Sequence, residues 1–179
     1  MRTCSAAVSL SGFSFSVLLL TGAGWSRADE PIVNPLINYA QFQNIVHTAS
    51  AAREVHRVTE KEFLAALHEP DTIVLDARSP AMYRLRHVRG AVNLPFTDFT
   101  AASLARVIPR HDAKIVIYCN NNFTGSPTAF AAKAPAASLN LSTYTSLIAY
   151  GYANVFELGP LLDVARTSIP FEGSEVAHF

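Results

Sequence analysis

The apolar run Lys-Ile-Val-Ile-Tyr at residues 114–118 is the feature that most constrains the fold, because it ends abruptly in Cys119. A short run rich in β-branched residues indicates a buried strand, and the polar, turn-prone residues that follow it indicate a loop. Cys119 is therefore expected at the carboxyl end of a strand. In open α/β sheets this edge is where ligands bind.

Ser126 and Pro127 suit the N-cap and the first position of a helix, so a helix is predicted from about residue 127 to residue 134. Its positive end and the loop amides would favour the thiolate form of Cys119 over the thiol. This makes Cys119 a candidate nucleophile. The alternative interpretation of the same position is a buried cysteine that packs as a small apolar side chain.

The first 28 residues have the pattern of a cleaved secretory signal. Arg2 precedes an uncharged stretch with a dense apolar core at residues 13–20, and Ser26 and Ala28 are the small residues that a signal peptidase requires. The protein is therefore expected to be periplasmic or secreted. The alternative is an uncleaved membrane anchor, although the strongly apolar core is short for a membrane span.

Cleavage would remove Cys4 and leave Cys119 as the sole cysteine, so no internal disulfide could form and the thiol would act by reaction or between molecules. The formal net charge is +0 and no block of like charges occurs, which gives no sign of binding to nucleic acid or, after cleavage, to a membrane. The histidines show no spacing typical of metal ligands, and no metal or organic cofactor is expected.

Strands and helices alternate along the rest of the chain, which predicts one α/β domain with a parallel sheet covered by helices. Strands are expected at residues 72–75, 91–94, 114–118 and 154–158, and helices at residues 36–55, 58–67, 80–86, 98–107, 127–134 and 139–150. Thr59 and Glu62 form the pattern of a capping box. We interpret residues 29–57 as an N-terminal extension with a helix, 58–173 as the domain, and 174–179 as a tail.

Four segments, in order, resemble the rhodanese-like domain family. The first contains Asp76, Arg78, Tyr83, His87, Gly90, Ala91, Asn93 and Pro95; the second is residues 115–124; the third contains Gly151, Tyr152, Asn154, Val155, Leu158 and Gly159; the fourth is residues 169–172. The resemblance implies a single rhodanese-like domain with a five-stranded parallel sheet flanked by helices on both faces. It also implies that Cys119 takes up a sulfane sulfur.

In a protein of this family, the Cys119 thiolate would take sulfur from thiosulfate or a similar anion and pass it to cyanide or a small thiol. The resemblance assigns donor binding to the loop amides of Asn120, Asn121, Asn122, Phe123 and Thr124, because consecutive backbone amides in a tight turn can surround an anion. The alternative for the three asparagines is an ordinary polar turn.

Two further positions of the family motif lie near the expected site. Arg78 would either attract the anionic donor or pair with Asp76 to hold the loop. His87 is expected to be a hydrogen-bonded structural residue. Both Asp76 and His87 are thus predicted to support the site.

The chain also departs from the family pattern. Its loop carries no charge and no glycine before Gly125, and Met82 replaces the usual glutamate before Tyr83. An insertion of about a dozen residues, around 133–143, follows the loop and suggests a lid or a surface for a protein partner. These departures leave two alternatives to a sulfurtransferase: a non-catalytic binding module, and a sensor whose Cys119 is oxidised or persulfidated.

Overall fold

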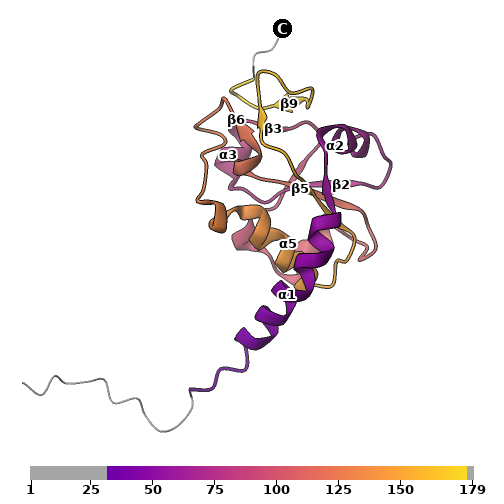
Figure 1. The fold of residues 1–179 in the computed structure, drawn as a ribbon, viewed down its shortest axis with the longest axis vertical. Helices are drawn as coiled ribbons and strands as arrows, with labels where there is room; N and C mark the ends of the chain where they lie inside the picture. Colours follow the sequence, from indigo (N-terminus) through magenta and orange to yellow (C-terminus); the bar gives the residue numbers. More distant parts are fainter. Residues whose placement is uncertain (1–31, 177–179) are drawn as a thin grey trace, which may run out of the picture. The chain divides into compact units, whose positions relative to one another are not determined.

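The computed structural model describes residues 32–176 of the 179-residue chain. Its main sheet has five strands: β1 (Arg57–Val58), β2 (Ile73–Asp76), β4 (Val92–Asn93), β5 (Ile115–Tyr118) and β7 (Val155–Leu158). Their order is β1-β7-β5-β2-β4 and every neighbouring pair is parallel (Figure 1). The predicted five-stranded parallel sheet is confirmed, and β5 lies at its centre.

Within residues 32–176, five α-helices accompany this sheet: α1 (Tyr39–Val55), α2 (Glu60–Ala66), α3 (Pro80–Leu85), α4 (Ala101–Val107) and α5 (Leu139–Ala149). Three short 3-10 helices are η1 (Phe96–Asp98), η2 (Asn120–Asn122) and η3 (Pro135–Ala137). Two short ladders complete the fold: β3 (His87–Val88) with β9 (Phe171–Glu172), and β6 (Phe123–Thr124) with β8 (Leu162–Asp163). The predicted capping box of Thr59 and Glu62 starts α2, as expected.

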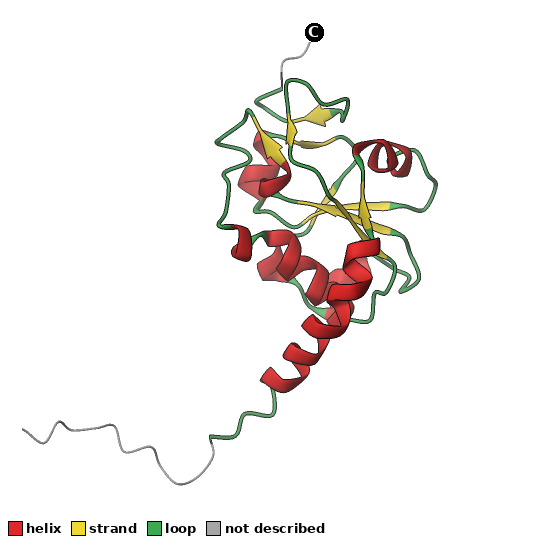
Figure 2. Cartoon of the chain, in the orientation of Figure 1, coloured by secondary structure: helices red, strands yellow, loops and turns green. Residues whose placement is uncertain are grey.

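Both faces of the sheet are buried, which explains why β5 is apolar at every position. Val116 and Tyr118 join one core cluster with Phe63 of α2, whereas Ile117 joins the other with Leu147 of α5. The sheet runs between helices on its two sides, α2 on one and α1 and α5 on the other (Figure 2). The predicted covering of both faces is confirmed.

The helix predicted at residues 127–134 is not formed. Residues 127–130 make a single turn, closed by a hydrogen bond from the Phe130 amide to the Ser126 carbonyl, and an extended segment follows. The hydroxyl of Ser126 donates to Glu175 at 2.8 Å, which ties this side chain to the C-terminal segment. Asn121 holds the backbone of Lys133 in this extended segment through two hydrogen bonds. The helix terminus expected to favour the Cys119 thiolate is therefore absent.

The N-terminal extension contributes directly to the fold. Its last residue, Arg57, belongs to β1, a strand that sequence reasoning missed because it is only two residues long. Helix α1 packs against α5, and Ala49 is buried between them in the core. None of the helices in the described residues combines the length and apolarity needed to cross a membrane. The predicted signal at residues 1–28 lies outside the described residues, and the domain boundaries stay predictions.

Candidate active site

Cys119 immediately follows the central strand β5 and begins a tight turn. Its amide donates to Oδ1 of Asn122 at 2.9 Å, and the Asn122 amide donates back to the Cys119 carbonyl at 3.2 Å. These reciprocal bonds fix the backbone of Cys119 at the carboxyl end of β5. The residue is only 1% exposed, and its Sγ lies 3.4 Å from the hydroxyl oxygen of Ser138, just before α5.

A pocket of about 220 Å³ opens beside this thiol. It is lined by Arg53, Arg57, Cys119, Asn121, Asn122, Pro135, Ser138, Asn140, Leu141, Glu157, Leu158 and Gly159. The lining comes from four parts of the chain: the end of α1 with β1, the loop after β5, the insertion, and the end of β7. The predicted insertion at residues 133–143 therefore builds one wall of the site and places Ser138 next to the sulfur.

Asn122 connects the loop to two other walls of the pocket. Its Nδ2 donates to the Leu158 carbonyl at 2.7 Å and to the Pro160 carbonyl at 3.3 Å. Its Oδ1 accepts from the Cys119 amide and, at 3.1 Å, from Nδ2 of Asn140. Since Asn122 is 5% exposed and its side chain makes four hydrogen bonds, its main role is to hold the thiol, the insertion and the end of β7 together.

A cluster of three charged side chains forms the opposite wall. Glu157, which is 2% exposed, binds the Nε of Arg53 at 3.0 Å through one carboxylate oxygen and the Nη2 of Arg53 through the other, and Arg57 lies 3.4 Å away. Burial raises the pKa of the Glu157 carboxyl, and the attraction of Arg53 and Arg57 opposes this rise. Glu54 lies 3.7 Å from each of the two guanidinium groups, so the two arginines are balanced by two carboxylates.

The raised pKa of Glu157 predicts a specific pH dependence of stability. A carboxyl whose pKa is higher in the folded than in the unfolded chain binds more protons when folded, so ionisation costs stability as the pH rises from the unfolded value through the folded one. We expect the free energy of unfolding of the wild type, minus that of Glu157→Gln, to decrease from pH 4 to pH 7. Urea unfolding across this range measures it; a difference that increases with pH would contradict the assignment.

The structure brings only part of the predicted binding loop to Cys119. Asn121 and Asn122 line the pocket, whereas Asn120 lines a neighbouring cavity. Phe123 is 3% exposed and packs among aromatic side chains in the core, and Thr124 pairs with β8. Two of the five amides proposed as an anion cradle are engaged within the turn, those of Asn122 and Phe123, which donate to the Cys119 and Asn120 carbonyls.

Arg78 does not line this pocket and has the contacts of the structural alternative. Its guanidinium binds the Asp76 carboxylate through Nε and Nη2 and also donates to the carbonyls of Ala129 and Arg86, both at 2.8 Å. The residue is 2% exposed. Asp76, the last residue of β2, is fully buried and accepts from the backbone amide and the guanidinium of Arg78. The expected role of Arg78 in binding a donor is not supported by these contacts.

His87 has the hydrogen-bonded position expected of a structural residue. Its Nδ1 lies 2.7 Å from the Tyr83 carbonyl, and its ring stacks on the Tyr83 ring with centroids 3.7 Å apart. The Nε2 atom lies 3.7 Å from Glu172. His87 belongs to β3, which pairs with β9, and it does not line the Cys119 pocket.

Sequence reasoning missed five residues of the site: Arg53, Arg57, Ser138, Asn140 and Glu157. One of them carries a recognisable signal, since Glu157 is a lone acid inside an apolar strand. A buried carboxylate needs a charged or hydrogen-bonding partner, so the strand pattern alone predicts a nearby base. Nothing in the sequence identifies that base as Arg53, which lies 104 positions away.

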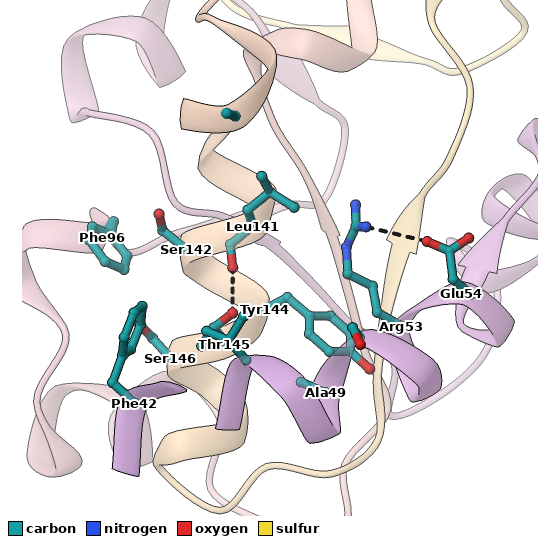
Figure 3. Close-up of a pocket in the computed structure, with 13 residues that line it drawn as sticks. Phe42, Ala49, Arg53, Glu54, Phe96, Leu141, Ser142, Tyr144, Thr145 and Ser146 are labelled. Carbon is teal, nitrogen blue, oxygen red and sulfur yellow. Dashed lines mark hydrogen bonds and ion pairs between the residues drawn. The ribbon is translucent and has the colours of Figure 1, made fainter. Parts of the chain in front are cut away.

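A second, more apolar pocket of about 380 Å³ lies between α1 and α5. Its lining includes Phe42, Ala49, Phe96 and Leu141, and Arg53 extends along one side of it (Figure 3). Arg53 and Leu141 line both pockets. Among the residues that the structure describes, no group of three or more His, Cys, Asp or Glu side chains is suited to hold a metal ion.

The fold and site define an α/β domain that places Cys119 at the carboxyl end of its central strand, beside a small pocket. A model of the rhodanese-like domain family matches residues 59–158, more than half of the chain, and the chain belongs to this family. Domains of the family act with small sulfur donors and acceptors.

A curated relative, the tRNA uridine(34) hydroxylase of Onion yellows phytoplasma, is 42% identical over 64 residues. This match covers 33% of the chain and 20% of the relative, so the chain spans about a fifth of that protein.

Two solved structures are similar to this chain at low sequence identity. A rhodanese with anions from E. coli is 21% identical, with a TM-score of 0.39 over 57% of this chain and 99% of that one. The thiosulfate sulfurtransferase from Pseudomonas aeruginosa is 17% identical, with a TM-score of 0.47 over 72% of this chain and 22% of that one.

Proposed function

We propose that this domain is a sulfurtransferase that carries sulfur as a persulfide on Cys119. The observation that supports it best is the pocket beside the thiol, whose wall carries two guanidinium groups. These groups belong to Arg53 and Arg57, which pair with Glu157 and Glu54 and lie beside a loop that has no charge of its own. The chemistry needs such a wall, because an anionic donor must approach a thiolate of the same sign.

In the first half-reaction the Cys119 thiolate attacks the outer sulfur of thiosulfate. The new S–S bond forms as the bond between the two thiosulfate sulfurs breaks, and sulfite leaves with the bonding electrons. In the second half-reaction a thiophilic acceptor, cyanide or a small thiol, attacks the outer sulfur and Cys119 leaves as a thiolate. The Ser138 hydroxyl, 3.4 Å from Sγ, can donate a hydrogen bond to the thiolate in both steps.

The shape of the site supports small substrates. Cys119 is nearly inaccessible to solvent, and its pocket is smaller than the roughly 300–1,000 Å³ typical of drug-sized ligands. A protein or a nucleic acid could reach the outer sulfur only if the segment around Ser138 moved. A protein partner at residues 133–143 stays a prediction.

The first test is the intact mass of the reduced protein before and after exposure to thiosulfate. We expect the wild type to gain one sulfur atom, which cyanide then removes as thiocyanate. The same exposure to sulfate, which has no sulfane sulfur, is the matched control and should add nothing. A wild type that gains no sulfur from thiosulfate or from a second sulfane donor would overturn the proposal.

The burial of Cys119 under Ser138 favours one alternative, a rhodanese-like module that binds a partner or an anion without chemistry. This alternative predicts no mass gain, together with ligand binding that persists when Cys119 is replaced. The mass experiment therefore separates the two functions directly.

We also propose that the domain acts outside the cytoplasm, in the periplasm or after secretion. Residues 1–28 have the features of a secretory signal, and the small residues Ser26 and Ala28 mark a cleavage site after Ala28. N-terminal sequencing of protein recovered from the exported fraction should begin at Asp29. Recovery of the full-length chain in the membrane fraction would favour the anchor instead.

A further inference from the structure

Helix α1 carries a stripe of side chains that α5 covers only in part. Tyr39, Phe42, Val46, Ala49 and Arg53 follow one another at spacings that alternate between three and four residues. This is the spacing of positions a and d in a coiled coil, which places all five side chains on one face of the helix. Ala49 is buried where α1 packs on α5, whereas Tyr39, Phe42 and Val46 are 68%, 52% and 42% exposed. The stripe therefore continues where α1 extends beyond α5 (Figure 1).

The apolar pocket between α1 and α5 lies along the same stripe. Phe42 and Ala49 line this pocket of about 380 Å³, and Phe96 lies near Phe42 at one end of it (Figure 3). Leu141, from the insertion, lines its other side. The rings of Tyr39 and Phe42 are neighbours, with centroids 6.2 Å apart. The exposed stripe and the pocket thus form one continuous apolar surface, which reaches the insertion predicted to bind a partner.

The charge of α1 decides which occupant this surface fits. The sequence has no Asp, Glu, Lys or Arg from Tyr39 to Ala52, although most of these residues are exposed. Helices that lie on membrane surfaces are rich in Lys and Arg on their polar face, so a membrane is not favoured. In a contact between two copies of one surface, a charge near the two-fold axis lies close to its own equivalent and repels it. An uncharged helix face avoids this repulsion and favours a second copy of the chain.

We propose that two copies of this chain form a dimer through α1, with the two helices antiparallel. A two-fold axis midway between Phe42 and Val46 brings Phe42 of one copy beside Val46 of the other. The same axis places the Tyr39 ring of one copy over Ala49 of the other, at the apolar pocket. A large side chain thus meets a small one, and each copy offers the same surface that it receives.

The expected dimer is weak. A fully buried aromatic side chain removes about 150–250 Å² from water, so the exposed parts of Tyr39 and Phe42 in both copies amount to about 500 Å² in total. Stable protein pairs bury about 1,200 Å² or more. The pocket walls and the insertion must supply the remainder, which places this contact at the small end of the range. We therefore expect monomer and dimer to exchange at micromolar concentrations.

Sedimentation equilibrium over a wide range of protein concentration, under reducing conditions, measures this association. Phe42→Asp places a carboxylate at the centre of the contact and is expected to raise the dimer Kd at least about thirtyfold. Asn44→Asp is the matched control, because it adds the same charge to α1 at an exposed position away from the stripe. The control should dimerise as the wild type does. Circular dichroism and the urea midpoint verify that both variants fold.

Disulfide trapping tests the direction of the two helices. Phe42→Cys and Val46→Cys are made separately in a chain that also carries Cys4→Ser and Cys119→Ser, so each protein has a single cysteine. In the antiparallel dimer these two positions are neighbours across the axis, and oxidation of a mixture of the two proteins should give a disulfide-linked heterodimer. Each protein oxidised alone should give far less dimer. Efficient trapping of each protein alone would indicate parallel helices and overturn the proposed arrangement.

Three other results would overturn the dimer. The first is a wild type that stays monomeric at every concentration, and the second is a Phe42→Asp protein with the Kd of the wild type. The third is a monomeric wild type that binds vesicles of neutral lipid while Phe42→Asp does not, which would assign the stripe to a membrane. Phe42 and Asn44 do not line the Cys119 pocket, so both variants should take up sulfur from thiosulfate as the wild type does. Failure of the proposed sulfur transfer and failure of the dimer are therefore separate results.

Discussion

Replacing Cys119 by serine is expected to abolish sulfur uptake and leave the fold intact. A hydroxyl of similar size can keep the contact with Ser138, and the substitution retains the hydrogen bonds of the residue-119 amide and carbonyl with Asn122. A serine oxygen cannot form a persulfide, so no sulfur should be gained from thiosulfate and no thiocyanate released. The measurement is intact mass after exposure to thiosulfate, with circular dichroism and the urea midpoint to verify the fold.

The matched control is Cys4→Ser in the full-length chain, because Cys4 is the only other cysteine. This variant should take up sulfur as the wild type does. A Cys119→Ser protein that keeps sulfur uptake would remove Cys119 from the reaction. Loss of uptake in the Cys4 variant would show that the N-terminal segment takes part in it.

The central part of the fold could be predicted from local sequence. The apolar run that becomes β5 has no polar position because both of its faces are covered, and Cys119 follows at the strand's carboxyl end as expected. The failure at residues 127–134 has a physical reason. Ser126 and Pro127 satisfy the local rules for a helix start. In the fold, however, the Ser126 hydroxyl donates to Glu175, and the Asn121 side chain is hydrogen-bonded to the backbone of Lys133 in an extended segment.

The pocket itself could not be predicted, because its walls come from segments far apart in the chain. The sequence places Arg53 in an expected helix and assigns it no function. Only the fold brings it beside Glu157 of β7. The sequence shows Asn140 as one polar residue at the start of an expected helix, and only the fold brings its side chain to Asn122. Tertiary contacts of this kind leave no periodicity or spacing in the sequence.

Arg78→Met is expected to destabilise the fold strongly. Its effect is on stability and not on substrate binding. Methionine keeps much of the apolar stem but removes every hydrogen bond of the guanidinium, and it leaves the fully buried Asp76 carboxylate without its ion partner. Breaking one side of a buried pair costs about 3–5 kcal/mol. Tyr118 still donates to Asp76, but burial and the nearby carboxylate raise its pKa well above the usual range, so it stays neutral and does not replace the lost charge.

Urea unfolding of Arg78→Met measures this loss, and Arg110→Met is its control, since Arg110 pairs with Asp112 on the exposed surface and should unfold at the wild-type midpoint. Under conditions where the Arg78 variant is still folded, its sulfur uptake from thiosulfate should match the wild type, because Arg78 does not line the Cys119 pocket. A variant of normal stability that fails to take up sulfur would reverse this assignment and make Arg78 a donor-binding residue. The position of its guanidinium, enclosed by Asp76, Ala129 and Arg86, argues for the structural role.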